Sequence, residues 1–385
     1  MSEARRPDHP ATARIDLGRI RENFRALRTY AGAKAVIPVL KADAYGHGAL
    51  AIARALEPMA VAMFAVAYVR EGVALRQSGI NTPILVLTGF APAQINELRE
   101  FNLTPVVSTH EHLRALEEHA ANEEAEPFRV HVKVDTGMSR LGFRLPEIEP
   151  VIHRIEDAGG LGIDGLMTHL ACADEDPMAT RGQLDAFDEA IFRLETLGVR
   201  PRLIHAANSA GMVYARDTHT AVRPGLLLYG LSPRPRSPQI EVRPAMELRA
   251  RVALVKTIPA GAKVSYGGKF VASGETRIAT INAGYADGVP RTDHMREKGV
   301  LRSGPFALPV AGSVCMDLTM LDATAAPTLA EGDEVTVFGE EPTAWDLAEW
   351  AGTNAWQVLT SVGARVPRIY APSDGFATES VTTPS

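Results

Sequence analysis

A single lysine stands where a buried strand is expected to meet a small, glycine-rich turn. Lys41 follows the apolar run 35–40 and precedes the turn 42–48, which contains Gly46 and Gly48. Burial of an ammonium group is costly, lowers its pKa and favours the neutral amine. A neutral amine attacks carbonyl carbons and forms Schiff bases. The position therefore predicts carbonyl chemistry at Lys41, although a lysine at a strand end more commonly just extends its charge to solvent.

Further polar residues follow other strand-like segments along the chain. If these strands are parallel and close into a barrel, their carboxyl ends meet at one face, where active residues of barrels gather. Each residue alone has an ordinary structural use, such as a loop cap, a core histidine or a surface arginine. Their shared placement favours a functional site, and the residues are Lys133, His169, Asn208, Ser209 and Arg223.

The last two of these strand ends have the composition of a phosphate site. Ser209 offers a hydroxyl and backbone N–H groups at a helix start, and Gly225 permits close approach of the backbone. In barrels, the loops after the seventh and eighth strands often bind phosphate. A lysine that forms Schiff bases opposite a phosphate site predicts pyridoxal 5'-phosphate (PLP) as the cofactor. No metal site is expected.

The elements that must position these residues alternate between strand and helix. Helical periodicity occurs between most of the strands, for example over 69–78 and 183–197. Eight such units in series predict a (β/α)8 barrel. The expected strands are 35–40, 63–67, 83–87, 104–107, 129–134, 163–168, 202–205 and 220–222.

The pattern changes after residue 244. Strand-like segments occur at 246–258, 275–282, 307–310, 318–321 and 334–338, and helical signals are few apart from 343–351. The predicted fold is therefore α/β, with an N-terminal (β/α)8 barrel followed by a C-terminal, mainly antiparallel β domain. The expected divisions are a disordered N-terminus (1–11), the barrel (12–240), the β domain (241–370) and a loose tail (371–385), with a proline-rich boundary at 232–238.

Composition narrows the possible functions. The chain has 385 residues, 46% of them hydrophobic, and a formal net charge of −6. This mild acidity does not favour nucleic acid or an anionic membrane as a partner, and no stretch is long and apolar enough to span a bilayer. Two cysteines, Cys172 and Cys315, are too few for a disulfide framework and fit a reducing cytoplasm. The polar start lacks the apolar core of a secretory signal.

Seven segments resemble the PLP-dependent alanine racemases in order and spacing. The resemblance covers residues 12–370, and the ordered set is far more specific than any single segment. The segments are VLKADAYGHG at 39–48, HVKVDTGMSRLG at 131–142, HAANSA at 205–210, VRPG at 222–225, VSYG at 264–267, GYADG at 284–288 and GSVCMD at 312–317. The fold of this family, a barrel followed by a β domain, agrees with the fold expected from the residues.

The resemblance implies two catalytic bases on opposite faces of the cofactor. Lys41 would hold PLP through its amine and act as the base for D-alanine, and Tyr266 would be the base for L-alanine. In this family the tyrosine comes from the partner subunit, so the resemblance implies a homodimer with shared active sites. Two bases remove the α-proton from one face and return a proton on the other without rotating the substrate.

The resemblance also assigns binding roles. Tyr45, Ser209, Gly225 and Leu226 would hold the phosphate, with Asn208 beside them; Arg223 would meet the pyridine nitrogen, with His169 behind it. Arg140 and Met316 would bind the substrate carboxylate, and Lys133, Tyr285 and Asp317 would support the site. Lys133 matches a lysine that is often carbamylated in relatives. One position departs from the family: Ala364 stands where some relatives have a tyrosine that touches the phosphate and lines the access route.

The expected function is interconversion of L- and D-alanine, with D-alanine supplied for peptidoglycan. Alternatives are a racemase of broader amino-acid range, another barrel-type PLP enzyme such as a decarboxylase, and a non-catalytic PLP-binding protein. The segments containing Tyr266 and Met316 favour racemisation, and the β domain argues against the non-catalytic protein. A lysine-dependent barrel aldolase fits less well, because Arg223 and the phosphate loop would have no role in it.

Overall fold

The computed structural model describes residues 9–120, 127–233 and 239–371. These residues form two compact units. The barrel unit contains residues 20–44 and the described residues from 49 to 242, and the β unit contains the described residues up to 19, residues 45–48 and those from 243 onward. The expected linker at 232–238 and the expected loose ends lie largely outside the described residues.

Eight parallel strands build the barrel unit. Strands β3 to β8 form one sheet in chain order, and β2 pairs with β9. All eight coincide with the segments expected from the sequence, which confirms the series of βα units. The strands are β2 (Ala35–Val36), β3 (Phe64–Val66), β4 (Ile84–Val86), β5 (Leu103–Val107), β6 (Phe128–Lys133), β7 (Leu161–Met167), β8 (Leu203–His205) and β9 (Ala221–Val222).

Two backbone contacts close the ring of strands. Just after β2, Val39 forms a parallel bridge with Ala65 of β3. On the other side, the N–H of Thr220, next to β9, donates to the carbonyl of Ile204 in β8 at 2.9 Å. The predicted (β/α)8 barrel is therefore confirmed, and the carboxyl ends of its strands meet at one face.

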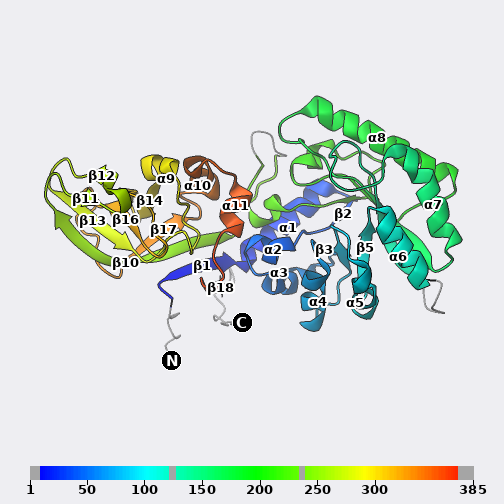
Figure 1. Ribbon diagram of the computed structural model, residues 1–385, viewed down its shortest axis with the longest axis horizontal. Helices are drawn as coiled ribbons and strands as arrows, with labels where there is room; N and C mark the ends of the chain where they lie inside the picture. Colours follow the sequence, from blue (N-terminus) through cyan, green and yellow to red (C-terminus); the bar gives the residue numbers. More distant parts are fainter. Residues whose placement is uncertain (1–8, 121–126, 234–238, 372–385) are drawn as a thin grey trace. The chain divides into compact units, whose positions relative to one another are not determined.

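Helices cover the outside of the barrel strands (Figure 1). They are α1 (Leu17–Ala31), α3 (Ala49–Leu56), α4 (Val69–Gln77), α5 (Ile95–Glu100), α6 (His110–Ala120), α7 (Ile148–Asp157) and α8 (Pro177–Thr196). Helix α8 begins six residues earlier than its apolar periodicity indicates, because Asp176 caps it by accepting the N–H groups of Met178 and Ala179. No helix of the described residues is long and apolar enough to cross a membrane.

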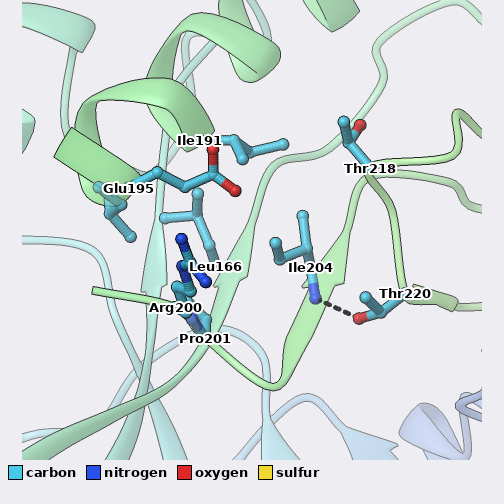
Figure 2. A pocket seen from close by; sticks show the side chains of 9 residues that line it. Leu166, Ile191, Glu195, Arg200, Pro201, Ile204, Thr218 and Thr220 are labelled. Atoms are coloured by element: carbon cyan, nitrogen blue, oxygen red, sulfur yellow. Dashed lines mark hydrogen bonds between the residues drawn. The ribbon is translucent and has the colours of Figure 1, made fainter. Parts of the chain in front are cut away.

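A cavity of about 220 Å³ shows which strand residues face outward. Leu166 of β7 and Ile204 of β8 line it together with Ile191 and Glu195 of α8 (Figure 2). Successive side chains of a strand point to opposite faces, so the neighbouring residue His205 points into the barrel. His205 is completely buried, as that orientation requires.

The β unit is built around the long strand β10 (Met246–Ile258) (Figure 1). Its main sheet has the order β15-β14-β17-β10-β1-β18, and β13 pairs with β10 and β16. All pairs are antiparallel except β1 with β18. The other strands are β1 (Ala11–Asp16), β11 (Lys263–Val264), β12 (Phe270–Val271), β13 (Thr276–Ile281), β14 (Val300–Ser303), β15 (Phe306–Pro309), β16 (Thr319–Asp322), β17 (Glu334–Phe338) and β18 (Arg368–Ala371).

The first strand belongs to the β unit, although we expected the residues from 12 onward to enter the barrel. Strand β1 pairs with β10 and β18, which lie more than two hundred residues later in the chain. Ala11, Ala13 and Ile15 are completely buried on one face of it. Because two of these three residues are alanines, the strand's alternating pattern is weak in the sequence.

The described residues from 243 onward contain three α-helices, whereas the sequence indicated one there. Helix α10 (Ala344–Ala351) was expected, and α9 (Asp293–Lys298) and α11 (Ala355–Thr360) were missed. The two missed helices have six residues each, too few for a periodic pattern. Their caps were the available signal: the Thr292 hydroxyl accepts the N–H of Met295 at 3.0 Å, and the side-chain Oδ1 of Asn354 accepts that of Gln357 at 2.9 Å.

Candidate active site

Lys41 begins a left-handed helical turn, α2 (Lys41–Tyr45). Ala42, Asp43 and Ala44 have φ angles of 53°, 52° and 53°, and Tyr45 has a φ of 54°. This conformation costs roughly 1–2 kcal/mol per residue for L-amino acids, so surrounding contacts must hold it. The turn that we expected after Lys41 is therefore a strained element. Tyr45 ends it with a buried side chain, and burial raises the pKa of its phenol.

Two carboxylates fix this turn. The Glu71 side chain of α4 accepts the N–H of Ala42 at 2.8 Å with one oxygen and the N–H groups of Ala67 and Tyr68 with the other. Asp43 accepts the N–H of Ala49 at 2.7 Å and so joins the turn to the start of α3. Lys41 thus leaves its strand in a direction set by the first turns of two barrel helices.

The Lys41 amine is half-buried and has no hydrogen bond or ion pair within the described residues. Burial is the main cause that lowers its pKa, and the positive charges of Arg140 and Arg223 lower it further. Glu71 acts in the opposite direction. The combined effect favours the neutral, nucleophilic amine.

A second amine lies close to the first. Lys133, at the end of β6, is 5% exposed, and its amine makes no hydrogen bond within the part of the chain that the structure describes. Burial, with help from Arg223 and Arg140, lowers its pKa to about 8. Arg140 itself is exposed and donates no hydrogen bond to any described residue. The strand ends therefore carry several cations without carboxylate partners, which suits an anionic ligand.

Arg223 follows β9 and is held in one position. Its side chain is 3% exposed. Nη1 donates to Nδ1 and to the carbonyl of His205, both at 2.7 Å, and Nη2 donates to the carbonyls of Thr168 and Ala206 at 2.8 and 3.0 Å. These four bonds use all four terminal N–H groups of the guanidinium. Within the described residues only Nε–H has no acceptor, so this group remains for a ligand.

The imidazole hydrogen-bonded to Arg223 is that of His205. The resemblance implied His169 behind Arg223, and that placement stays a prediction. His169 contacts the site only electrostatically: burial, then Arg223 and Lys133, lower its pKa well below the ordinary value, so its ring is neutral. The sequence analysis did not propose a role for His205, which lies at the end of the short strand β8.

The loops after β8 and β9 are joined through Ser209. Its hydroxyl oxygen accepts the N–H of Gly225 at 3.0 Å and that of Leu227 at 3.3 Å. Asn208 stabilises the first loop by accepting the N–H of Gly211 at 2.8 Å. The buried N–H of Leu226, between the two bonded amides, donates to no described residue. A phosphate oxygen at this point would supply the missing acceptor.

The remaining predicted site residues gather in the β unit. Ser265 donates its hydroxyl to the carbonyl of Ser313 at 2.6 Å, and the Ser313 hydroxyl donates to the carbonyl of Tyr266 at 3.2 Å. These bonds join the loop that carries Tyr266 to the loop that carries Met316. Tyr266 and Met316 are 66% and 52% exposed, so this part of the unit presents large apolar side chains to its surroundings.

Tyr285 lies beside this pair. The guanidinium carbon of Arg291 is 5.9 Å from the ring centre of Tyr266 and 5.6 Å from that of Tyr285, which places one cation against both rings. The N–H of Tyr285 also donates to the carbonyl of Cys315 at 3.0 Å. A side chain at Gly284 would come within 2.3 Å of that carbonyl oxygen, so the close packing of the two loops requires glycine there.

Arg365 is a residue of this cluster that sequence reasoning missed. It binds both oxygens of the buried Asp287, at 2.8 and 3.0 Å, and one oxygen of Asp317 at 2.7 Å. Asp317 follows Met316 directly, so Arg365 links the loop containing Met316 to the turn 284–288. The sequence segment 361–368 was noticed for Ala364, but nothing in it indicates these distant partners.

The predicted site residues thus form two clusters. The barrel cluster consists of Lys41, Lys133, Arg140, His169, Asn208, Ser209, Arg223, Gly225 and Leu226. The second cluster, in the β unit, contains Tyr266, Tyr285, Met316 and Asp317, and Tyr45 is also assigned to that unit. An unpartnered amine, a fixed guanidinium donor and a free amide at a phosphate-like loop can hold a ligand that carries a carbonyl, an acceptor nitrogen and a phosphate.

Comparison with known proteins identifies the family of the chain. Sequence profiles of two families match the chain: "Alanine racemase, N-terminal domain" over residues 15–233 and "Alanine racemase, C-terminal domain" over residues 245–370. The alanine racemase of Carboxydothermus hydrogenoformans is 37% identical over 369 residues, which cover 94% of this chain and 99% of the relative. That of Sorangium cellulosum is 39% identical over 377 residues, with the same coverage.

Solved structures give the same result. The alanine racemase of Clostridium difficile 630 superimposes with a TM-score of 0.91 at 32% identity, covering 97% of this chain and 99% of that one. The enzyme from a D-cycloserine-producing Streptomyces lavendulae gives 0.88 at 36% identity, covering 96% and 98%. These relatives place the chain among the amino-acid racemases, which are isomerases. The chain belongs to the alanine racemase family.

Proposed function

We propose that the chain interconverts L-alanine and D-alanine with PLP, using Lys41 and Tyr266 as bases on opposite faces of the substrate. The observation that carries this proposal is the Lys41 amine: half-buried, without a partner in the described residues, and with a lowered pKa. The names of the relatives, all alanine racemases, support alanine as the substrate. PLP, when bound, withdraws electrons from the α-carbon of an amino acid and so acidifies its α-proton.

The groups without partners fit this cofactor. The Lys41 amine would bond the aldehyde carbon, the Nε–H of Arg223 would donate to the ring nitrogen, and the N–H of Leu226 would donate to the phosphate. Ser209 and Gly225 hold that amide in place. A guanidinium beside the ring nitrogen disfavours a proton on that nitrogen by like-charge repulsion, which favours prompt return of a proton to the α-carbon.

The chain's own groups bind the substrate and move its proton. Arg140, exposed and without a partner in the described chain, would bind the alanine carboxylate. The Lys41 Nζ would take or return the α-proton on one face, and the Tyr266 hydroxyl would do so on the other. The low polarity around Lys41 favours its neutral form at each stage in which it must accept a proton.

We further propose that two copies of the chain share their active sites. Tyr266, Met316 and Tyr285 are large, exposed side chains of the β unit, and such residues are common at the centre of protein interfaces. In the dimer, Tyr266 and Met316 would serve the Lys41 of the partner. D-alanine for peptidoglycan is the proposed physiological product, and the two free cysteines are compatible with a cytoplasmic location.

One assay tests the proposal. The protein is incubated with L-alanine and PLP, and D-alanine is measured by chiral chromatography. We expect D-alanine to accumulate toward equal amounts of the two enantiomers, and Lys41→Ala to abolish both this activity and the yellow absorbance of the lysine–PLP adduct. Lys256→Ala, at an exposed lysine of β10, is the matched control and should behave as the wild type. Release of carbon dioxide without D-alanine, or normal absorbance in Lys41→Ala, would refute the proposal.

A further inference from the structure

The charge of Arg223 is buried without a carboxylate beside it. Within the described residues, its only side-chain acceptor is Nδ1 of His205, at 2.7 Å, and its other acceptors are backbone carbonyls. Burial lowers the pKa of Arg223 to about 9, which expresses how poorly this environment stabilises the charge. The groups behind His205 therefore matter for the position and charge of Arg223.

A second buried imidazole continues the contact. Nε2 of His205 lies 2.8 Å from Nδ1 of His131 in β6, and both side chains are completely buried. On its far side, Nε2 of His131 lies 3.7 Å from a carboxylate oxygen of Asp164. Arg202 binds that carboxylate with two N–H groups, at 3.2 and 2.9 Å. A row of polar groups from β6, β7 and β8 thus ends at Arg223, the residue after β9, and its widest step is the 3.7 Å between His131 and Asp164.

The row permits one arrangement of protons. A guanidinium has only donors, so Nδ1 of His205 must accept and its proton must sit on Nε2. That proton is donated to Nδ1 of His131, which places the proton of His131 on Nε2, facing the negative carboxylate of Asp164. Burial lowers the pKa of both histidines, so each imidazole is neutral and carries only one N–H. All donors then point from Arg223 toward Asp164.

The fold makes room for this row at two places. The pairing of β6 with β7 shifts by one residue after Val130, and Asp164 is the extra residue of the resulting bulge. Bulges re-aim side chains, and here the bulge lets a partly exposed aspartate reach toward His131. The next residue is Gly165, and a Cβ atom added at this position would lie 2.4 Å from the His131 ring. Any larger residue there would displace His131.

We propose that Asp164, His131 and His205 are positioning residues for Arg223 and that they control the one N–H that Arg223 offers to the cofactor. The Asp164 carboxylate, 3.7 Å from Nε2 of His131, favours the same tautomer of His131 that the Arg223 donors require through His205. Both ends of the row therefore keep a lone pair of His205, rather than a hydrogen, facing Arg223. The role assigned to Arg223 rests on the proposed function, whereas the tautomers do not. A partly exposed ion pair, Asp164 with Arg202, thereby acts on the active site through the barrel interior.

The chain contains a matched control with the same local geometry. Asp188 of α8 binds Arg216 and lies 3.8 Å from Nε2 of His219, whose side chain is fully buried. Nδ1 of His219 faces the backbone N–H of Arg216, at 3.4 Å, and the ring has no hydrogen bond to Arg223. Asp188→Asn therefore removes an equivalent carboxylate without touching the proposed row.

The first test reads the tautomers directly. The full-length protein is labelled with ¹⁵N-histidine, and its imidazoles are examined by NMR at neutral pH before and after addition of PLP. We expect His131 and His205 to be neutral, with the proton on Nε2 in both. A proton on Nδ1 of either ring, or a charged ring, would overturn the proposal whether or not the protein is a racemase.

The second test follows Arg223 through the cofactor. In Asp164→Asn we expect the dissociation constant for PLP to rise and kcat to fall, each about tenfold, as small displacements of a positioned group commonly cause. The KM for alanine should not change, because the affected donor contacts the cofactor. Asp164→Glu should restore most of both values, and Asp188→Asn should match the wild type. Equal behaviour of Asp164→Asn and Asp188→Asn contradicts the proposal.

The two tests separate this inference from the function on which its second part depends. If the wild type neither binds PLP nor racemises alanine, the proposed function fails. The NMR measurement of the tautomers of His131 and His205 still tests the proposed arrangement of protons. If the wild type is active but Asp164→Asn keeps normal PLP affinity and normal kcat, the positioning role fails alone. Because Asp164 is partly exposed, its substitution should leave the fold intact, which circular dichroism verifies.

Discussion

The carboxylate of Glu71 accepts the backbone N–H of Ala42 at 2.8 Å, which joins the first turn of α4 to the residue after Lys41. The same side chain accepts two further N–H groups, those of Ala67 and Tyr68. Ala42 has a left-handed conformation that costs free energy, so its amide needs a strong acceptor. Glu71 thus holds the backbone beside Lys41, and its negative charge opposes the other groups that lower the pKa of that lysine.

Glu71→Ala should therefore destabilise the protein and misplace Lys41. Three N–H groups lose their acceptor, for which we expect a decrease of about 1–3 kcal/mol in the free energy of unfolding, measured by urea denaturation. The rate at which added PLP forms its adduct with Lys41 should also fall. Glu97→Ala, at an exposed glutamate of α5, is the control. Equal stability of the two variants would show that Glu71 does not hold the turn.

Lys133 should make the stability of the protein depend on pH. Its pKa is about 8 in the folded state, against an ordinary value of 10.5. Between these two values the unfolded chain binds more protons, so the free energy of unfolding rises with pH through this window. Below pH 8 the buried charge opposes folding, and Lys133→Met should then be more stable than the wild type by about 3 kcal/mol.

This difference should shrink as the pH rises from 8 to 10.5 and vanish above that range. Urea denaturation in buffers free of carbon dioxide measures it, and Lys256→Met, at an exposed lysine, should show no such trend. A difference between Lys133→Met and the wild type that is constant with pH would contradict the lowered pKa.

The same amine should react with carbon dioxide. Its neutral form attacks the carbon atom, a proton leaves the nitrogen, and the product is a negatively charged carbamate. Arg140, Arg223 and Lys41 all act on Lys133 as positive charges, so an anion at this position is favoured. With ¹³C-bicarbonate we expect a carbamate signal by NMR in the wild type and none in Lys133→Met. A signal of equal strength in both proteins would assign the carbamate elsewhere.

Much of the barrel was predictable, because each strand is a short apolar run and most of the intervening helices have apolar residues at helical spacing. Lys41, Lys133 and Arg223 could be placed at strand ends for the same reason. Strand β1 was missed because its partners are distant in sequence and its buried face contains two alanines. Local patterns therefore predicted the architecture, whereas long-range pairing decided which unit the first strand joins.

The missed residues of the site have in common that their bonds reach far along the chain. Glu71 binds Ala42, and Arg365 binds Asp287, with no local pattern for either pair. His131 did leave a signal. It precedes Lys133 by two residues in the same strand, so both side chains point to the interior of the barrel. A polar pair on the inner face of a barrel strand is unusual enough to indicate a function.

Tyr266→Phe should affect one enantiomer more than the other. If its hydroxyl serves only one face, exchange of the α-hydrogen of L-alanine with deuterium oxide should slow far more than that of D-alanine, because Lys41 still serves the second face. Proton NMR follows both exchanges. Tyr30→Phe, at an exposed tyrosine of α1, is the control and should change neither. Equal slowing for both enantiomers would show that the Tyr266 hydroxyl does not serve only one face of the substrate.

Arg365→Gln should loosen the loops that carry Tyr285 and Met316. Arg365 binds Asp287 and Asp317, and the backbone bonds from Tyr285 to Cys315 and from the next residue to Met316 depend on this alignment. Hydrogen exchange followed by mass spectrometry should become faster over residues 284–288 and 313–318 and stay unchanged over β10. The KM for alanine should rise more than kcat falls, because Met316 is expected to bind the substrate carboxylate. Arg302→Gln, at a residue of β14 that forms an ion pair with Glu341, should leave these peptides unaffected. Unchanged exchange in Arg365→Gln would mean that the loops keep their alignment without the arginine.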